Sequence, residues 1–120
     1  MPFVDTAAIE EYERLPGWHG RIFQSPSMTF ATWRFAAGAE IHAHHHEQEE
    51  VWQVLEGELE VTIGGETRRA GPGMAAIVPA DTPHSVRALS DGRAMVVDWP
   101  LRDDMRRDGA KDAPAAGLPI

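Results

Sequence analysis

The stretch His42-Ala43-His44-His45-His46-Glu47-Gln48-Glu49-Glu50 contains four of the six histidines in the chain. Side chains alternate between the two faces of an extended strand, so His42, His44 and His46 are expected on one face and His45 on the other. Glu50 opens the apolar run at residues 51–55. Two imidazoles and a carboxylate at this spacing suit a first-row divalent metal ion. Taken alone, the same residues also fit a solvated polar loop.

Composition limits the partners that the chain can bind. The 120 residues fit one domain and leave no room for two independent cores. A formal net charge of −8 disfavours nucleic acid and anionic membrane surfaces, although a metal ion and one Arg can still create a local site for an anionic substrate. With no cysteine in the chain, a metal must be held by imidazole and carboxylate, which suits Zn, Mn, Fe, Ni or Co.

The N-terminal residues 1–13 are acidic and do not resemble a signal peptide. No apolar run reaches the roughly 20 residues that span a bilayer, and we therefore expect a cytoplasmic protein. Residues 5–13 are expected to form a short helix, capped by Asp5 or Thr6. The Ala-, Gly- and Pro-rich residues 106–120 show no periodicity and are expected to be a disordered tail.

Between residues 21 and 98 the pattern is that of an all-β protein. Short runs rich in β-branched and aromatic residues alternate with Gly and Pro, as is typical of a sandwich or barrel. The pair Gly64-Gly65 predicts a two-residue hairpin turn, and Glu56-Gly57 predicts a second turn. The expected strands lie at residues 28–36, 51–55, 59–63, 74–78, 85–89 and 93–99.

Two groups of spaced residues resemble the two motifs of the cupin superfamily. The first group is Gly38, His44, His46, Glu50 and Gly57, and the second is Gly73, Pro79 and His84. Two positions depart from the second motif, since Asp81 stands where it usually has Gly and Ala88 where it often has Asn. The resemblance implies a double-stranded β-helix, or jelly-roll barrel, with its conserved part at about residues 28–98 of a single domain at residues 1–105.

The resemblance also implies that His44, His46, Glu50 and His84 hold one divalent transition metal ion, with one or two positions open to water or substrate. His42 remains an alternative to His46, and Glu49 is a weaker alternative to Glu50. Inward-facing Glu50 predicts that Trp52 and Val54 also face the interior. His84 likewise predicts inward Val86 and Ala88, whereas the strand at residues 28–36 could turn either Trp33 and Phe35 or Phe30, Thr32 and Arg34 inward.

The residues Pro100-Leu101-Arg102-Asp103-Asp104 resemble the C-terminal end of the small pectin-degradation cupins, which ketonise unsaturated uronates. The resemblance implies that Arg102 grips a substrate carboxylate with its planar fork. The catalytic Asp of that family falls here on Val96, but Asp98 lies an even number of residues later and can face the same side. The alternative for Arg102 is a surface ion pair with Asp103 or Asp104, which contributes little to stability.

We therefore expect a metal-dependent enzyme acting on a small carbonyl or carboxylate substrate such as a sugar acid, as an isomerase or tautomerase, with Asp98 and Arg102 as catalytic residues. The alternatives are an Fe(II)-dependent dioxygenase and a non-catalytic cupin that binds a sugar or another small ligand. A homodimer is expected because open sheet edges need cover, with the segment Trp18-His19-Gly20-Arg21-Ile22-Phe23 as the candidate for pairing between chains.

Overall fold

The computed structural model describes residues 2–105 and 120. Within them the chain forms ten strands and two 3₁₀ turns, η1 (Thr6–Ala8) and η2 (Asp103–Met105). The strands are β1 (Tyr12–Leu15), β2 (Trp18–Gln24), β3 (Thr29–Phe35), β4 (Glu40–His44), β5 (Glu49–Glu56), β6 (Leu59–Ile63), β7 (Glu66–Ala70), β8 (Ala75–Val78), β9 (His84–Ala88) and β10 (Gly92–Trp99).

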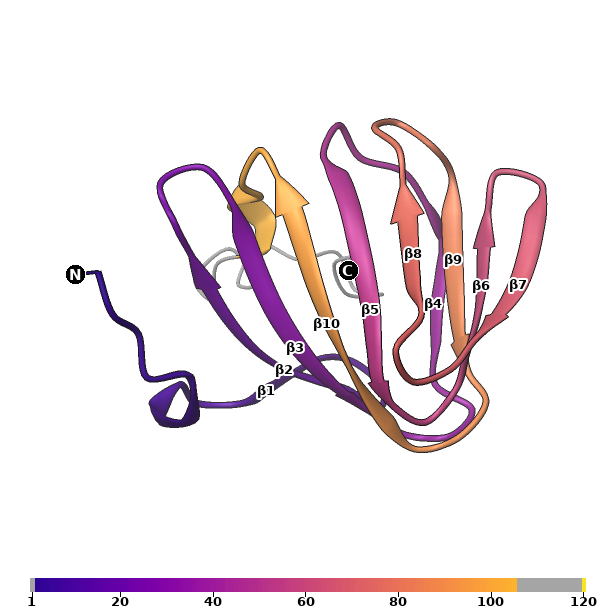
Figure 1. Cartoon of the computed structure of the whole chain (residues 1–120), viewed down its shortest axis with the longest axis horizontal. Coiled ribbons are helices and arrows are strands. Elements are labelled where there is room, and N and C mark those ends of the chain that lie inside the picture. The colour runs from indigo at the N-terminus through magenta and orange to yellow at the C-terminus, as the bar shows by residue number, and fades with distance from the viewer. Residues whose placement is uncertain (1, 106–119) are drawn as a thin grey trace.

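The strands form two antiparallel sheets that face each other across one core (Figure 1). The six-stranded sheet has the order β1-β2-β3-β10-β5-β8, and the four-stranded sheet has the order β4-β9-β6-β7. This is the predicted jelly-roll barrel. The predicted hairpin at Gly64-Gly65 is also present, joining β6 to β7 with Ile63 opposite Glu66.

The first residues differ from the helix expected at residues 5–13. Only η1 is helical, capped as predicted by Asp5, whose Oδ1 accepts a hydrogen bond of 3.1 Å from the Ala7 amide. Strand β1 follows and pairs with β2. A helix of nine residues is marginal in water, because nucleation costs more than so few hydrogen bonds return, so pairing at the sheet edge outweighs the local helix preference.

The alternation of side chains between the inward and outward faces was predicted correctly in strands whose pairing with their neighbours is regular. Glu50, Trp52 and Val54 are all buried on β5, and His84, Val86 and Ala88 are buried on β9. On β3 the structure selects the first of the two alternatives, since Trp33 and Phe35 lie in the core. The polar residues Glu50 and His84 therefore lie on the same inward face as the apolar core.

Strand β2 is paired on both sides, with β1 and with β3. β3 pairs with the whole of the segment Trp18–Phe23, whereas β1 pairs with it only at Trp18, His19 and Gly20. Pairing of this segment with a neighbouring chain is therefore blocked at those three residues and stays a prediction for residues 21–23. Among the described residues, no helix is long and apolar enough to span a membrane. Residues 106–119 of the expected disordered tail lie outside the described part of the chain, while Ile120 is described and is fully buried.

Candidate metal centre

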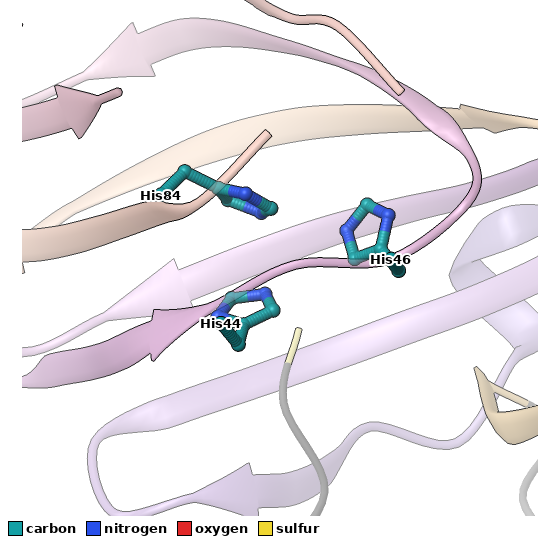
Figure 2. Close-up of side chains that lie close together, drawn as sticks. All are labelled: His44, His46 and His84. Atoms are coloured by element: carbon teal, nitrogen blue, oxygen red, sulfur yellow. The ribbon is translucent and has the colours of Figure 1, made fainter. Parts of the chain in front are cut away.

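Three of the predicted ligands meet at one end of the barrel. His44 ends β4, His46 follows in the loop before β5, and His84 begins β9, where it lies opposite His44. Their rings point toward a common space (Figure 2), with the His44 and His84 ring centres 4.2 Å apart and those of His46 and His84 4.9 Å apart. One ring nitrogen from each of the three lies within 4.8 Å of the others, which is compact enough for one ion.

Each of these imidazoles is oriented by a backbone carbonyl. Nδ1 of His44 lies 2.8 Å from the His42 oxygen, and Nδ1 of His84 lies 2.8 Å from the Thr82 oxygen. Nδ1 of His46 lies 3.1 Å from the oxygen of Gln48. A carbonyl only accepts hydrogen bonds, so in neutral His46 and His84 these contacts place the proton on Nδ1 and leave the Nε2 lone pair facing the site. Both ring nitrogens of His44 face main-chain oxygens, since its Nε2 lies 2.7 Å from that of Ile120. Histidine ligands of metals are commonly held in this way.

Glu50 completes the cluster from the opposite sheet. Its side chain is fully buried, with Oε1 3.3 Å from His46 Nε2 and Oε2 3.2 Å from His84 Nε2. Neither Nε2 has a hydrogen-bond partner among the described residues, and neither does Oε1. Buried polar atoms are rarely left without a partner, so this convergent set has the chemistry of a divalent-metal site and fits such an ion.

The electrostatics of Glu50 and His44 agree with this assignment, whereas those of His84 favour its protonated form. Burial acts to raise the pKa of Glu50, but the close contacts of its carboxylate with the polar side chains around it, His46 and His84 first, outweigh burial and hold the pKa below its usual range. Burial lowers the pKa of His44 to about 4. Burial acts in the same direction on His84, but the Glu50 carboxylate more than compensates and raises its pKa. Glu50 is therefore ionised and His44 neutral near pH 7, which are the forms that bind metals.

His42 is not among the grouped donor atoms, although its ring centre lies 5.8 Å from that of His44, and the expectation that it shares the inward face is wrong. The register of β4 against β9 shifts between Ile41, which faces Val86, and His44, which faces His84. A β-bulge thus adds one residue and breaks the alternation. Ile41 is buried, whereas His42 is exposed on the outer face beside Glu40 and Thr62. Glu49, the other alternative ligand, is also exposed.

Asp98 lies beside the cluster, opposite Glu50 on the neighbouring strand β10. Like Val96 on the same strand it is buried, so both face the interior. Burial, together with the negative charge of Glu50, raises the pKa of Asp98 to about 9. The Oδ1 atom of Asp98 has no hydrogen-bond partner among the residues that the structure describes. His46, Glu50 and Asp98 form a second group of closely spaced donor atoms.

Arg102 also lies at the site, but part of its guanidinium group is already hydrogen-bonded to Asp104. Its Nε donates to Asp104 Oδ1 at 3.0 Å and its Nη2 to Asp104 Oδ2 at 2.6 Å. The remaining Nη1 lies 3.6 Å from Glu50 Oε1 and 3.9 Å from Asp98 Oδ2. The pair with Asp104 is not a surface ion pair, because the Arg102 side chain is only 2% exposed.

Two further contributors were not predicted from the sequence. Arg14 of β1 donates hydrogen bonds to the Asp104 backbone oxygen at 3.0 Å and to Asp104 Oδ2 at 3.3 Å. It therefore fixes Asp104, which in turn binds Arg102. Ile120 lies at the site, with its backbone oxygen 2.7 Å from His44 Nε2. Neither contact has a local sequence signal, since the partners are 90 and 76 residues apart.

Comparison with known proteins agrees with the geometry. The cupin domain family matches residues 31–100. KdgF from Halomonas sp. is 30% identical, with a TM-score of 0.82 over 88% of this chain and 99% of that one. TT1209 from Thermus thermophilus is 33% identical, with a TM-score of 0.69 over 85% of this chain and 100% of that one.

An RmlC-like cupin from Shewanella frigidimarina has the same fold, with 22% identity and a TM-score of 0.83 over 88% of this chain and 96% of that one. No curated protein matches the chain. The family match covers more than half of the chain, and it includes both motifs from His44 to His84. The chain therefore belongs to the cupin family.

Proposed function

We propose that His44, His46, His84 and Glu50 hold one divalent transition metal ion, and that the chain is an enzyme that isomerises or tautomerises a small carbonyl- and carboxylate-bearing substrate such as a sugar acid. The observation that carries the metal assignment is the orientation of the histidines. The Nδ1 atoms of all three are turned to backbone carbonyls, while their Nε2 atoms converge beside a buried carboxylate. One divalent cation can accept lone pairs from all three rings and from the carboxylate at once.

When bound, such an ion supplies Lewis acidity that polarises a carbonyl or hydroxyl oxygen. Proton transfer and substrate binding would depend on the chain's own residues. Asp98 Oδ1, buried and without a hydrogen-bond partner among the described residues, is placed to take or give a proton. Arg102 presents only Nη1 to the site, so a substrate carboxylate would meet that single nitrogen rather than two nitrogens of the guanidinium group. The buried walls around them exclude water, which strengthens both interactions.

Support for a sugar-acid substrate comes from Asp98 and Arg102 lying together at the metal site. Their side chains approach within 3.9 Å, and both are buried beside Glu50. The resemblance of residues 100–104 to pectin-degradation cupins, and the 30% identity to KdgF from Halomonas sp., favour the same class of substrate.

The test is conversion of a ring-form unsaturated uronate by metal-loaded protein, followed by loss of ultraviolet absorbance and by NMR of the product. Asp98→Asn should abolish turnover without lowering the bound metal. Asp103→Asn, at an exposed neighbour of the site, is the matched control and should change neither. If Asp98→Asn turns over every uronate at the wild-type rate, Asp98 is not the proton carrier.

The purified protein also tests the alternative function, that of an Fe(II)-dependent dioxygenase. Two histidines and a carboxylate also suit Fe(II). Iron as the dominant metal after purification without added metal, together with oxygen consumption, would replace the isomerase proposal with an oxidative one. Tight binding of a uronate without any turnover would instead indicate a binding protein.

We also propose that the protein forms a homodimer. In the described residues the outermost strands are β1 and β8 of one sheet and β4 and β7 of the other. Unpaired strand edges of this kind favour association between chains. Ile77 on β8 is 62% exposed, which adds apolar surface to that edge. Sedimentation of the wild type and of Ile77→Lys measures whether a dimer exists and whether β8 contributes to it.

A further inference from the structure

The outer face of the six-stranded sheet carries a continuous apolar row that crosses five of its strands. The register of the strands sets one residue of each beside the next, from β2 through β3, β10 and β5 to β8. None of the five belongs to the core cluster, and because side chains alternate along a strand they lie on the opposite, outward face. The row consists of Phe23, Phe30, Val97, Val51 and Ile77.

Further apolar side chains widen this row. Met95 and Trp99 lie two residues to either side of Val97 on the same strand and are 38% and 58% exposed. The rings of Phe23 and Phe30 stack with their centres 4.9 Å apart. An antiparallel sheet with one face on the core normally presents polar residues on the other face, so an apolar outer face indicates contact with a partner.

We propose that a second copy of this chain packs on this face, sheet against sheet, with the two-fold axis along β10. The proposal rests on the homodimer of the proposed function and names its surface. Among the described residues, the three levels of the sheet at Met95, Val97 and Trp99 carry only two charged side chains, Arg21 and Glu49, although the chain has a net charge of −8. A basic partner would be drawn to the acidic remainder of the surface, whereas a face this poor in charge matches a second copy of itself.

The charges at the border of the apolar row are complementary under this symmetry. An axis along β10 exchanges the strands on its two sides, so β3 of one copy lies over β5 of the other. Phe30 then lies at the level of the partner's Val51, and Arg34 lies at the level of the partner's Glu56. The Arg34 and Glu56 side chains are 56% and 65% exposed, so opposite charges face each other across the interface. Arg93, on the axis itself, already has Glu56 of its own chain at 3.7 Å.

The face is also large enough for a dimer. Strands lie about 4.8 Å apart and rise about 3.4 Å per residue, so six strands over the length of β10 cover roughly 24 Å by 27 Å, or about 650 Å² in projection. A standard interface buries about 800 Å² of accessible surface on each partner, with an apolar centre and a polar rim. Side chains that project from the sheet add accessible area to the projected value, so the two areas are comparable.

The first experiment places a charge on the two-fold axis. Both edges of β10 are paired, so Met95 can contact another copy through the face and not through a strand edge. Met95→Lys sets two like charges against each other and should raise the dissociation constant of the dimer at least about tenfold in analytical ultracentrifugation. Thr62→Lys, on the outer face of the doubly paired strand β6 in the other sheet, is the matched control and should leave the constant unchanged. Circular dichroism checks that both variants are folded.

The second experiment tests the geometry without adding a charge. The chain has no cysteine, so Met95→Cys introduces one thiol into each copy. Packed sheets lie about 10 Å apart, which is too far for a disulfide but suits a bismaleimide cross-linker with a short spacer. Met95→Cys should form a covalent dimer with this reagent at protein concentrations at which Thr62→Cys does not.

The outcomes separate the surface from the homodimer itself. A folded Met95→Lys variant that associates as the wild type does would overturn the outer face as the interface and leave the homodimer to a strand edge. Cross-linking of Met95→Cys no greater than that of Thr62→Cys would do the same. A wild type that is monomeric throughout the concentration series would overturn the homodimer and its surface together, while the metal site is tested independently.

Discussion

A single carboxyl group, that of Asp98, is held in an unfavourable state by the residues around it. It lies opposite Glu50, and burial together with the negative charge of Glu50 raises its pKa to about 9. In the unfolded chain the same group titrates near its ordinary value of about 3.9. The folded protein therefore holds a proton on Asp98 across neutral pH that the unfolded chain does not.

Metal-free wild type should consequently lose stability as pH rises from 7 to 8.5. In that window the folded state binds the extra proton, so the free energy of unfolding falls by about 1.4 kcal/mol per pH unit. The raised pKa of His84 acts with the same sign, and His44, with its pKa lowered to about 4, has finished titrating. Asp98→Asn should be more stable at pH 8 and show a flatter profile in urea unfolding. An Asp98→Asn variant with the wild-type slope would show that Asp98 is not the group responsible.

The backbone of Asp81 also has an unfavourable conformation. It is the only residue other than glycine with a positive φ in the described part of the chain, at +59°, and it stands where the cupin motif has Gly. Its amide donates to the His46 oxygen at 2.8 Å, which ties the second motif to the first. The departure from the motif therefore leaves the turn geometry intact.

Asp81→Gly should raise the free energy of unfolding by up to about 1 kcal/mol, because glycine adopts this conformation without strain. Asp81→Val should lower it, since a β-branched side chain fits a positive φ worst. Thermal unfolding of the metal-free proteins measures both changes. A loss of stability in the Asp81→Gly variant would indicate that the Asp81 side chain contributes more than its backbone costs.

At the scale of the strands, the sequence predicts which side chains face inward along a regular strand. It does not predict β-bulges or contacts between distant segments. Alternation from Glu50 placed Trp52 and Val54 correctly, because β5 is an unbroken strand. The same rule failed at His42, because the bulge between Ile41 and His44 inserts one residue and leaves no distinct mark in the sequence.

Contacts between distant segments are the other limit. Asp104 was considered only as a surface partner of Arg102, yet it is clamped by Arg14 of β1, 90 residues away. The position of Ile120 could not be inferred from a stretch without periodicity. Spacing within motifs, by contrast, placed His44, His46, Glu50 and His84 in one cluster, because each motif spans two consecutive strands and the short loop between them.

The link from β1 to Arg102 predicts an effect of Asp104 on substrate binding. Asp104→Asn removes the charge that fixes two N–H groups of Arg102, so Nη1 should lose its fixed direction toward the site. The KM for a ring-form unsaturated uronate should rise by about tenfold, as expected for one charge-assisted hydrogen bond. Mn²⁺ affinity should stay unchanged. Asp103→Asn, which alters an exposed neighbour, is the control, and an equal KM in both variants would remove Asp104 from this role.

For the molecule as a whole, the site joins two sheets that are otherwise held together by apolar packing. Glu50 and Asp98 come from the six-stranded sheet, and His44 and His84 come from the four-stranded sheet. An ion that binds all of them except Asp98 adds a direct connection between the sheets. Such an ion stabilises the native state by mass action, because the unfolded chain lacks the assembled site.

Saturation with the bound metal at about one hundred times its Kd should add about 2.7 kcal/mol to the free energy of unfolding, or roughly 10 °C in Tm for a domain of this size. His84→Ala should lose this increase. His45→Ala, at the exposed histidine of the same run, should keep it. Differential scanning calorimetry with and without a chelator measures the shift, and an equal increase in both variants would place the metal elsewhere.

The hydrogen bond from Trp52 to the cluster has an optical consequence. The Trp52 indole Nε1 donates to Glu50 Oε2 at 2.7 Å, within the buried interior. Tryptophan emission responds to charge beside the indole and is quenched by paramagnetic ions nearby. Trp52 is thus a natural fluorophore placed one hydrogen bond from a proposed ligand, so the intrinsic emission of the unlabelled protein should report whether the centre is filled.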